Sequence, residues 1–238
     1  MTEATINGRE IIYWEAGAVC CDPAWEAAYE QFETPEEEIR KFIARHRRLG
    51  VDRLPKTSHA VELFCGRGNG LKALERLGFK HLEGVDLSSN LAARYCGPAQ
   101  LYVGDCRNLQ FDAHSKDLVV VQGGLHHLPI LPDDLERVLA EINRVLRPTG
   151  HVAIVEPWLT PFLRGVHTAY QSRLLRRLWP KLDALASMNE REETTYAAWL
   201  RQPALIHELL GKFFVTETCV HRFGKLLFLG RPAGQSAC

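Results

Sequence analysis

The segment Val61-Glu62-Leu63-Phe64-Cys65-Gly66-Arg67-Gly68-Asn69-Gly70 is the most informative stretch of this sequence. An apolar run that ends in an acidic residue leads into a glycine-rich turn, and the apolar spacing of residues 71–77 indicates that a helix follows. Glycines in such a turn let the backbone approach a ligand closely, because a Cβ would clash there. The stretch therefore predicts a strand, a tight turn and a helix that form one wall of a ligand site.

Two further apolar runs after this turn also end in an acidic residue. The second predicted strand ends at Asp86 and the third at Asp105, so that three successive strands, the first with Glu62, each end in an acid. Asp86 follows Gly70 by sixteen residues, near the offset of roughly 20 residues expected of a ribose-binding acid in a βαβ unit. A carboxylate that reaches two vicinal hydroxyls forms charge-assisted hydrogen bonds. The pattern predicts a nucleoside site that suits a cationic, hydroxyl-rich ligand better than a phosphate.

Apolar runs alternate with amphipathic segments from residue 60 onward, which is typical of βαβ units and a parallel sheet. Strands are predicted at residues 60–64, 82–86, 100–103, 117–121 and 151–155, and a closing antiparallel pair at 213–219 and 225–230. Helices are predicted near residues 24–32, 35–49, 70–77, 89–95 and 133–146. The fold class is therefore α/β, a doubly wound and mostly parallel sheet.

These motifs resemble those of the class I S-adenosylmethionine (SAM) dependent methyltransferases, especially the small-molecule branch often called type 11. Glu62, Gly66 and Gly68 match the acidic residue and G-x-G turn of that family's first motif, while Phe64 stands where its usual first glycine does. The stretch 145–155, with its Arg-Pro-Thr-Gly turn, resembles the family's entry into the fifth strand. The resemblance implies a Rossmann-like methyltransferase fold with a seven-stranded sheet ending in a hairpin, and helical lid elements.

The resemblance also implies SAM as the cofactor and gives roles to the matching residues. Asp86 is expected to bind the ribose hydroxyls and Asp105 to face the adenine amino group, with the two glycines nearest the methionine end. The implied cofactor-binding residues are Glu62, Gly66, Gly68, Asp86, Leu87, Asp105, Cys106 and Gln122. An NAD-binding Rossmann dehydrogenase would explain the glycines and Asp86 but neither Asp105 nor the Arg-Pro-Thr-Gly turn. It is therefore the third interpretation, after an active methyltransferase and an inactive SAM-binding protein.

A histidine pair, His126 and His127, follows the fourth predicted strand, and Glu156 ends the fifth. Methyl transfer needs positioning and desolvation of the acceptor, and a base only if the acceptor must lose a proton. His126 is a candidate to face the acceptor, whereas His127 either packs under a helix or lines the acceptor site. Glu156 either orients an amine or hydroxyl, acts as base, or bonds its own lid. We predict His126 and Glu156 as the catalytic residues.

Residues 158–203 exceed the usual link between a fifth strand and its helix, and they are rich in aromatic residues and arginine. Such an insertion at the carboxyl side of a parallel sheet predicts a lid. We expect an N-terminal helical cap at residues 1–50, with the first 24 residues irregular, and a methyltransferase domain at residues 51–238 that carries the lid insertion. The candidate substrate-binding residues are Tyr13, Trp14, His127 and Trp158.

The amino-acid composition limits the classes of partner molecule that the sequence predicts. The 29 basic and 29 acidic residues balance, with a pI near 7.1, which disfavours nucleic acid as a partner. No C-x-x-C pair is present and the histidines lack metal-ligand spacing, so no metal is expected. No stretch approaches the roughly eighteen apolar residues of a membrane helix, and the start lacks a basic and apolar leader. We expect a reduced, cytoplasmic protein with a small-molecule acceptor and no membrane partner.

The function predicted from the sequence is transfer of a methyl group from SAM to an oxygen, nitrogen or carbon of a small molecule. An alternative of a different class is a catalytically inactive SAM-binding partner or sensor protein, because the cofactor residues support binding in either case. The Asn/Asp-Pro-Pro motif of exocyclic amino methyltransferases acting on nucleic acid is absent, since Gln122-Gly-Gly-Leu stands after the fourth strand. No cysteine follows a proline, which argues against the cytosine carbon-5 enzymes.

Overall fold

The structure is a computed structural model that describes residues 2–6, 9–14 and 23–234. Its strands are β1 (Thr2–Ile6), β2 (Arg9–Tyr13), β3 (His59–Leu63), β4 (His81–Asp86), β5 (Gln100–Val103), β6 (Lys116–Gln122), β7 (Leu146–Pro157), β8 (Phe214–Arg222) and β9 (Lys225–Pro232). Its helices are α1 (Pro23–Phe32), α2 (Pro35–Leu49), α3 (Asn69–Arg76), α4 (Ser89–Ala92), α5 (Asp133–Val145), α6 (Pro161–Tyr170), α7 (Arg173–Leu178), α8 (Pro180–Arg191), α9 (Glu193–Arg201) and α10 (Pro203–Phe213).

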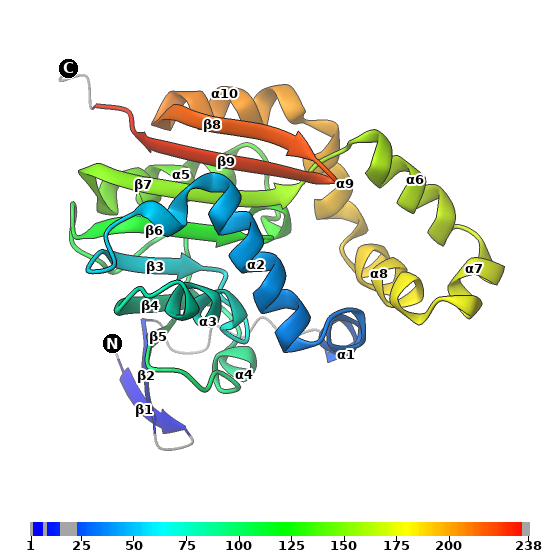
Figure 1. Ribbon diagram of the computed structural model, residues 1–238, viewed down its shortest axis with the longest axis horizontal. Helices are drawn as coiled ribbons and strands as arrows, with labels where there is room; N and C mark the ends of the chain where they lie inside the picture. Colours follow the sequence, from blue (N-terminus) through cyan, green and yellow to red (C-terminus); the bar gives the residue numbers. More distant parts are fainter. Residues whose placement is uncertain (1, 7–8, 15–22, 235–238) are drawn as a thin grey trace.

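The described strands form one sheet in the order β1-β2-β5-β4-β3-β6-β7-β9-β8 (Figure 1). The six strands from β2 to β7 in this order run parallel, while β1 and the pair β9-β8 are antiparallel to their neighbours. The chain order reverses between β3 and β6, which is the switch point where ligands bind in open α/β sheets. The doubly wound, mostly parallel fold predicted from the sequence is confirmed.

The sheet has nine described strands rather than the seven expected, because the N-terminal residues are not irregular. β2 pairs in parallel with β5, with Ile11 beside Leu101 and Tyr13 beside Val103, and β1 pairs with β2. The segment 1–50 therefore contributes two strands to the sheet as well as α1 and α2. The apolar Ile-Ile-Tyr cluster was the signal for a strand, but its partner lies about ninety residues further along the chain, where sequence periodicity gives no information.

Helices cover both faces of the sheet, and the central strand β6 shows why. Its successive side chains point to opposite faces, as in any strand. Val119 and Val121 are fully buried in the core formed with α5 and α10, whereas Leu118 and Val120 are fully buried in the core formed with α2 and α3. Figure 1 shows α5 and α10 behind the sheet and α2 and α3 in front of it. A strand buried on both faces reads as a continuous apolar run, as in Leu-Val-Val-Val.

Helix α2 is the best-defined helix of the N-terminal region. The Thr34 hydroxyl accepts a hydrogen bond from the Glu37 N–H, and the Glu37 carboxylate accepts one from the Thr34 N–H, which completes a capping box. Pro35 fits the first turn, and Gly50 ends the helix with a positive φ of 78°. These signals fix the ends of α2 and bring its buried His46 to the underside of β6.

Helices α6 to α9 lie between β7 and α10 and extend beyond the sheet (Figure 1). Side chains of Thr160 and Ser172 accept hydrogen bonds from backbone N–H groups in the first turns of α6 and α7. α8 packs against α1, so that the two segments expected to cover the site are in contact with each other. In the described part of the chain, no helix is long and apolar enough to cross a bilayer.

Candidate active site

The glycine-rich turn after β3 has a left-handed backbone at several positions. Phe64, which replaces the usual glycine, takes a φ of 56°, a conformation that is strained for a residue with a side chain. Its ring packs on the backbone of Gly124, where an added Cβ would lie 2.2 Å from the Phe64 ring. The turn after β3 is thereby held against the loop after β6, which carries the histidine pair.

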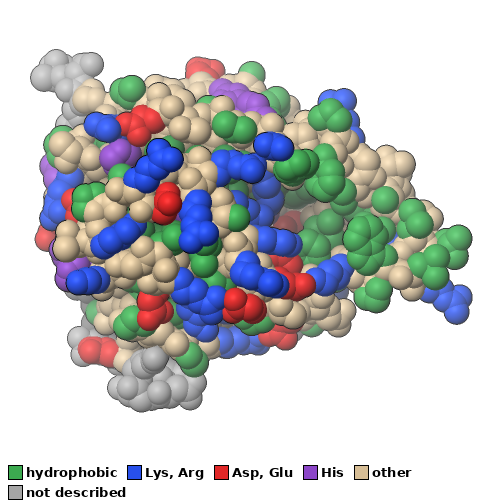
Figure 2. All heavy atoms as spheres, in the orientation of Figure 1, with side chains coloured by type: hydrophobic (Ala, Val, Ile, Leu, Met, Phe, Trp, Pro, Cys, Tyr) green, Lys and Arg blue, Asp and Glu red, His purple; other side chains and the backbone are tan. Residues whose placement is uncertain are grey.

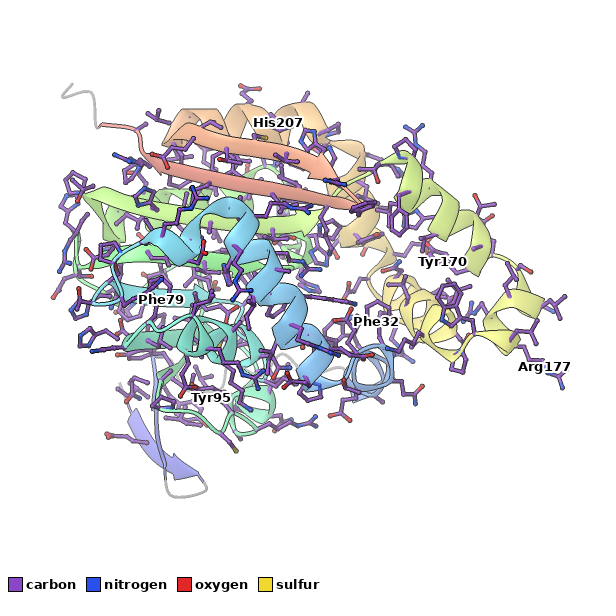
Figure 3. The ribbon with its side chains drawn as sticks, viewed as in Figure 1. Phe32, Phe79, Tyr95, Tyr170, Arg177 and His207 are labelled. Carbon is purple, nitrogen blue, oxygen red and sulfur yellow. The ribbon has the colours of Figure 1, made fainter. Side chains whose placement is uncertain are left out.

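The glycines of the turn have different neighbours. A Cβ added to Gly66 would meet nothing closer than 3.9 Å, whereas one on Gly68 would lie 2.2 Å from the Tyr95 ring. A Cβ on Gly70 would lie 1.7 Å from the Glu62 carboxylate. Figure 3 labels Tyr95, which follows α4. Gly66 alone of these three has open space beside it, and Gly68 and Gly70 are required by packing within the protein.

Asp86 holds the glycine-rich turn from the end of β4. Its two carboxylate oxygens accept hydrogen bonds from the N–H groups of Gly66 and Ser88, each at 2.7 Å. Leu87, the next residue, is half-buried beside it. The acid expected to bind ribose therefore lies against the same turn as the first motif, and the structure brings these two parts of the predicted cofactor site together.

Asp105 follows β5, and its carboxylate is bound by the side chain of Arg107. The Arg107 Nε lies 2.9 Å from one Asp105 oxygen, and the same guanidinium reaches Asp134 at 3.0 Å. Burial raises the pKa of Asp105, but the hydrogen bonds from Arg107 outweigh burial and hold that pKa below its usual value. Cys106 beside it is buried, and burial raises the pKa of its thiol. Asp105 is thus ionised and engaged by an arginine, a partner that the sequence analysis did not consider.

Glu62, Gln122 and His46 form a buried polar group under the switch point. Gln122 hydrogen-bonds the Glu62 carboxyl, and its Nε2 lies 3.3 Å from His46 Nε2. Burial, followed by the nearby charge of Glu38, raises the pKa of Glu62 well above its usual value. Two acceptors in this group, Glu62 Oε2 and Gln122 Oε1, are buried without a hydrogen-bond donor. Buried acceptors without a donor are rare in folded proteins, so these two oxygens are available to a hydrogen-bond donor.

His126 and Glu156 form a buried pair at the carboxyl ends of β6 and β7. His126 Nδ1 lies 2.7 Å from Glu156 Oε2, while the other Glu156 oxygen accepts the N–H groups of Gly124 and Leu125 at 2.8 and 2.9 Å. Burial lowers the pKa of His126, but the hydrogen bond to Glu156 outweighs it and the pKa is raised. Burial raises the pKa of Glu156, and its hydrogen bond to His126 brings that pKa below its usual value. The two residues predicted to act together are in direct contact.

The lid insertion adds an acid and one aromatic ring to this pair, and α1 adds a second ring; none of the three was among the predicted site residues. Glu192, between α8 and α9, lies 3.2 Å from His127 Nδ1 and 3.7 Å from His126 Nε2. The ring of Tyr196 meets His126 edge-on, and Trp25 of α1 meets His127 in the same way. Burial, followed by the neighbouring His126, lowers the pKa of His127 to about 4. Only the aromatic content of the insertion pointed toward these residues.

Ligand atoms of His126, His127 and Glu192 lie within 4.8 Å of one another, and so do those of His207, Cys219 and His221 (His207 is labelled in Figure 3). The first group is a charge-paired cluster, because each nitrogen of His126 already faces a carboxylate. The second lies between α10 and β8, away from the glycine-rich turn. Metal-ligand spacing in the sequence could not reveal either group, since their members come from distant segments.

The aromatic residues expected to line the acceptor site lie elsewhere. Tyr13 belongs to β2, and Trp14 is buried against Tyr102 and Phe111 on the β5 side of the sheet, several strands from His126. Trp158 stacks on the ring of His221 and lines a groove of about 410 Å³ between α6 and the β8–β9 turn. Of the four predicted substrate residues, the structure brings only His127 into contact with the His126–Glu156 pair.

A hollow lies between α2 and the lid helices in Figure 2, with Lys and Arg side chains on the α2 side and apolar side chains on the lid side. Two cations, Lys225 near Glu156 and Arg45 near Lys225, form no ion pair within the described residues. Burial lowers the pKa of Lys225 to about 8, and the charge of Arg45 lowers it further. The floor of the crevice is thus acidic and its rim is basic.

Residues 61–154 match a family described as a methyltransferase domain. A demethylmenaquinone methyltransferase from Staphylococcus epidermidis is 33% identical over 126 residues, which cover 48% of this chain and 50% of that protein. A solved structure from Pyrococcus horikoshii OT3 is similar at a TM-score of 0.66 and 20% identity, covering 90% of this chain and 100% of that one. A second solved structure is that of a geranyl diphosphate C-methyltransferase from Streptomyces coelicolor A3(2) with Mg²⁺, geranyl diphosphate and S-adenosyl-L-homocysteine. It is similar at a TM-score of 0.60 and 14% identity, covering 92% of this chain and 90% of that one. The chain spans about half the length of the curated relatives that it matches.

Proposed function

We propose that this chain, whose residues 61–154 belong to the methyltransferase domain family, transfers a methyl group from SAM to a hydroxyl of a small-molecule acceptor. The observation that carries the proposal is the buried His126–Glu156 pair, which lies beside the glycine-rich turn through the contact of Phe64 with Gly124. A buried histidine oriented by a carboxylate is the arrangement that accepts a proton from a hydroxyl.

The residues of the crevice fit SAM. An ammonium group of the methionine part would supply donors to Glu62 Oε2 and Gln122 Oε1, the two buried acceptors that lack them. Gly66 leaves room beside the turn for the methionine part, and Asp86 is half-buried at the place where the family resemblance puts ribose. Leu87 and Cys106 would flank the adenine. Bound SAM supplies the electrophilic methyl group.

In this proposal His126 is the catalytic base and Glu156 is its positioning residue. Both oxygens of Glu156 already accept hydrogen bonds, so it holds the ring of His126 and fixes the proton on Nδ1. Nε2 is then the nitrogen that accepts the acceptor's proton. Glu192 now faces Nε2, and the acceptor hydroxyl would enter in its place. Removing that carboxylate lowers the pKa of His126, which makes the neutral ring available as a base.

The lid residues support an acceptor with an apolar ring. Trp25 and Tyr196 stand edge-on to the histidine pair, and the apolar side chains of the lid face the hollow in Figure 2. A relative is named demethylmenaquinone methyltransferase, and the substrate in that name also carries an apolar ring system. Residues 23–32 and 158–199 would open to admit the acceptor and close to exclude water.

Two measurements test this proposal. Calorimetry should show that the protein binds SAM and S-adenosyl-L-homocysteine but not NAD. Transfer of radiolabelled methyl from SAM to a panel of naphthohydroquinones and phenols should then show turnover, with His126→Ala reducing it about 10²–10⁴-fold while SAM affinity stays unchanged.

The matched control is His151→Ala, which removes a histidine that also faces a glutamate, Glu217, but in the middle of β7 rather than at its carboxyl end. It should keep full turnover. SAM binding without transfer to any acceptor of the panel would favour the inactive sensor or partner protein. Full turnover in His126→Ala would show that catalysis depends only on positioning the acceptor and that His126 is not a base.

A further inference from the structure

Helix α7 and the residue after it carry an unusual concentration of exposed apolar side chains. Leu174, Leu175, Leu178 and Trp179 are four of the ten large apolar residues that are exposed in the described part of the chain. Leu174, Leu178 and Trp179 expose 66%, 71% and 60% of their surface. Figure 1 shows α7 at the outermost end of the lid, and Figure 2 shows apolar side chains gathered there. Contiguous exposed apolar surface of this kind marks an interaction site.

The geometry of α7 directs these side chains away from the protein. Arg176 points inward, because its guanidinium binds Asp183 and Glu190 of α8. At 100° per residue, Leu174 and Leu178 lie on the side of the helix opposite Arg176. The outward direction of the two leucines is therefore fixed by an ion-pair anchor on the inner side.

Arginines flank the outward apolar face. Arg173 and Arg177 are exposed, and neither forms an ion pair within the described residues. Figure 3 labels Arg177 at the tip of the lid, pointing away from the molecule. Leucine and tryptophan beside unpaired arginines suit an interface that is apolar inside and anionic at its surface, which is the chemistry of a bilayer containing acidic lipids.

We propose that α7 docks this protein on an anionic phospholipid surface, with Leu174, Leu178 and Trp179 inserted at the headgroup boundary. This surface goes beyond the proposed methyl transfer and is measured without it. It would place the lid, and the hollow behind it, next to the membrane. An acceptor dissolved in lipid would then reach the histidine pair from the bilayer side of the lid.

The test uses the full chain and vesicles of phosphatidylglycerol or of phosphatidylcholine, without SAM or acceptor. Trp179 is the one exposed tryptophan of the five, since Trp14, Trp158 and Trp199 are buried and Trp25 is half-buried. Its emission should therefore shift to the blue when phosphatidylglycerol vesicles are added. Sedimentation with the vesicles measures the affinity, which should fall as salt is raised.

Two variants separate the contributions. Leu174→Ser/Leu178→Ser should weaken binding to phosphatidylglycerol vesicles at least tenfold while Trp179 remains as the probe. Arg173→Gln/Arg177→Gln should remove the preference for phosphatidylglycerol over phosphatidylcholine. The matched control is Val215→Ser/Val220→Ser, which removes two exposed apolar side chains from β8 and should bind as the unaltered protein does.

Several results would overturn the proposal. The first is no sedimentation of the unaltered protein with phosphatidylglycerol vesicles. The second is an equal loss of binding in the Val215→Ser/Val220→Ser control. The third is a dimer in light scattering that Leu174→Ser/Leu178→Ser converts to a monomer, because the face would then bind a second copy. None of these results bears on turnover, so each is distinguishable from a failure of the proposed methyl transfer.

Discussion

The cofactor side and the acceptor side of the crevice are built in different ways. On the cofactor side, acids at strand ends accept hydrogen bonds from within one strand-turn-strand unit. Asp86 binds Ser88 and the Gly66 N–H twenty residues before it, and Asp105 binds Arg107. On the acceptor side, the His126–Glu156 pair joins residues thirty positions apart, and Glu192 reaches it from the lid. The cofactor side is a local motif, and the acceptor side is assembled by the fold.

This difference has an energetic counterpart. The Asp86 carboxylate is half-buried, so water shares in its solvation, whereas Glu156 is fully buried. A buried charge that loses its partner is far more costly than an exposed one. We therefore expect variants on the acceptor side to change stability as well as catalysis, and variants on the cofactor side to change mainly ligand affinity.

The largest expected effect is on the acceptor side. Glu156→Ala leaves His126 and the N–H groups of Gly124 and Leu125 without their acceptor in a buried place. We expect the free energy of unfolding, measured in urea, to fall by about 3–5 kcal/mol. Glu217→Ala, which removes the partly exposed partner of His151, should cost less than about 1 kcal/mol. An equal loss of unfolding free energy in Glu156→Ala and Glu217→Ala would show that burial of the acceptor-side pair does not raise its cost.

On the cofactor side, Asp86→Asn should weaken SAM binding and lower stability less than Glu156→Ala does, because only one of its two backbone hydrogen bonds, from Gly66 or Ser88, is lost. The amide keeps one oxygen as an acceptor for the backbone and loses the charge that strengthens hydrogen bonds to hydroxyls. We expect the affinity to fall by about 1.5–3 kcal/mol, the value typical of hydrogen bonds to charged groups, as measured by calorimetry. An Asp86→Asn protein that is strongly destabilised but binds SAM normally would contradict the expected difference between the two sides of the crevice.

Glu62 predicts a pH dependence of cofactor binding. Its pKa is raised in the folded protein by burial and then by Glu38, so its protonated form persists above the pH at which an exposed glutamate ionises. Its contribution to stability is therefore present at low pH and is lost as pH rises through the raised value. The cationic ammonium of SAM favours the ionised form, so affinity should rise with pH by up to about tenfold per unit. Glu62→Gln should remove this dependence, and an unchanged slope in that variant would assign it to another group.

The smallest effect is expected at the basic rim. The pKa of Lys225 is lowered to about 8 by burial and by Arg45, below its ordinary value of 10.5, so its charge costs the folded protein stability below pH 8. Between pH 8 and 10.5 the unfolded chain holds the proton that the folded protein has released, and stability rises with pH. Lys225→Met should add about 1 kcal/mol to the free energy of unfolding at pH 7. Lys212→Met, at an exposed lysine paired with Glu136, should add nothing measurable.

The doubly wound sheet predicted from the sequence is confirmed, and residues 61–154 match the methyltransferase domain family that the sequence motifs resemble. They were predictable because the glycine-rich turn and the strand-end acids are local patterns that recur at fixed spacing. The two N-terminal strands were not, because Ile11 and Ile12 form a strand only by pairing with β5. A short apolar cluster has no periodicity that reveals such a partner.

In the candidate site, too, some residues could be predicted from the sequence and others depend on tertiary packing. His126 and Glu156 could be placed together because the ends of neighbouring parallel strands meet at one edge. Glu192, Tyr196 and Trp25 could not, since the angle at which lid helices return to the sheet depends on tertiary packing. Trp14, which was predicted to bind the acceptor, packs against Tyr102 and Phe111 for a related reason, because an aromatic residue next to a strand packs into whichever core is nearest.

The two antiparallel hairpins, β1–β2 and β8–β9, bracket the parallel strands on either side of the sheet. A parallel strand at an edge would offer its free backbone groups to any other extended chain, which is a route to aggregation. Here the outermost strands are instead β1, five residues long, and β8, which carries the charged residues Glu217 and Arg222. The hairpins thus cover the outer parallel strands, and this hinders the addition of a strand from another molecule. A chain cut back to Pro23 would keep every residue of the proposed active site, yet it would expose β5 as a new edge.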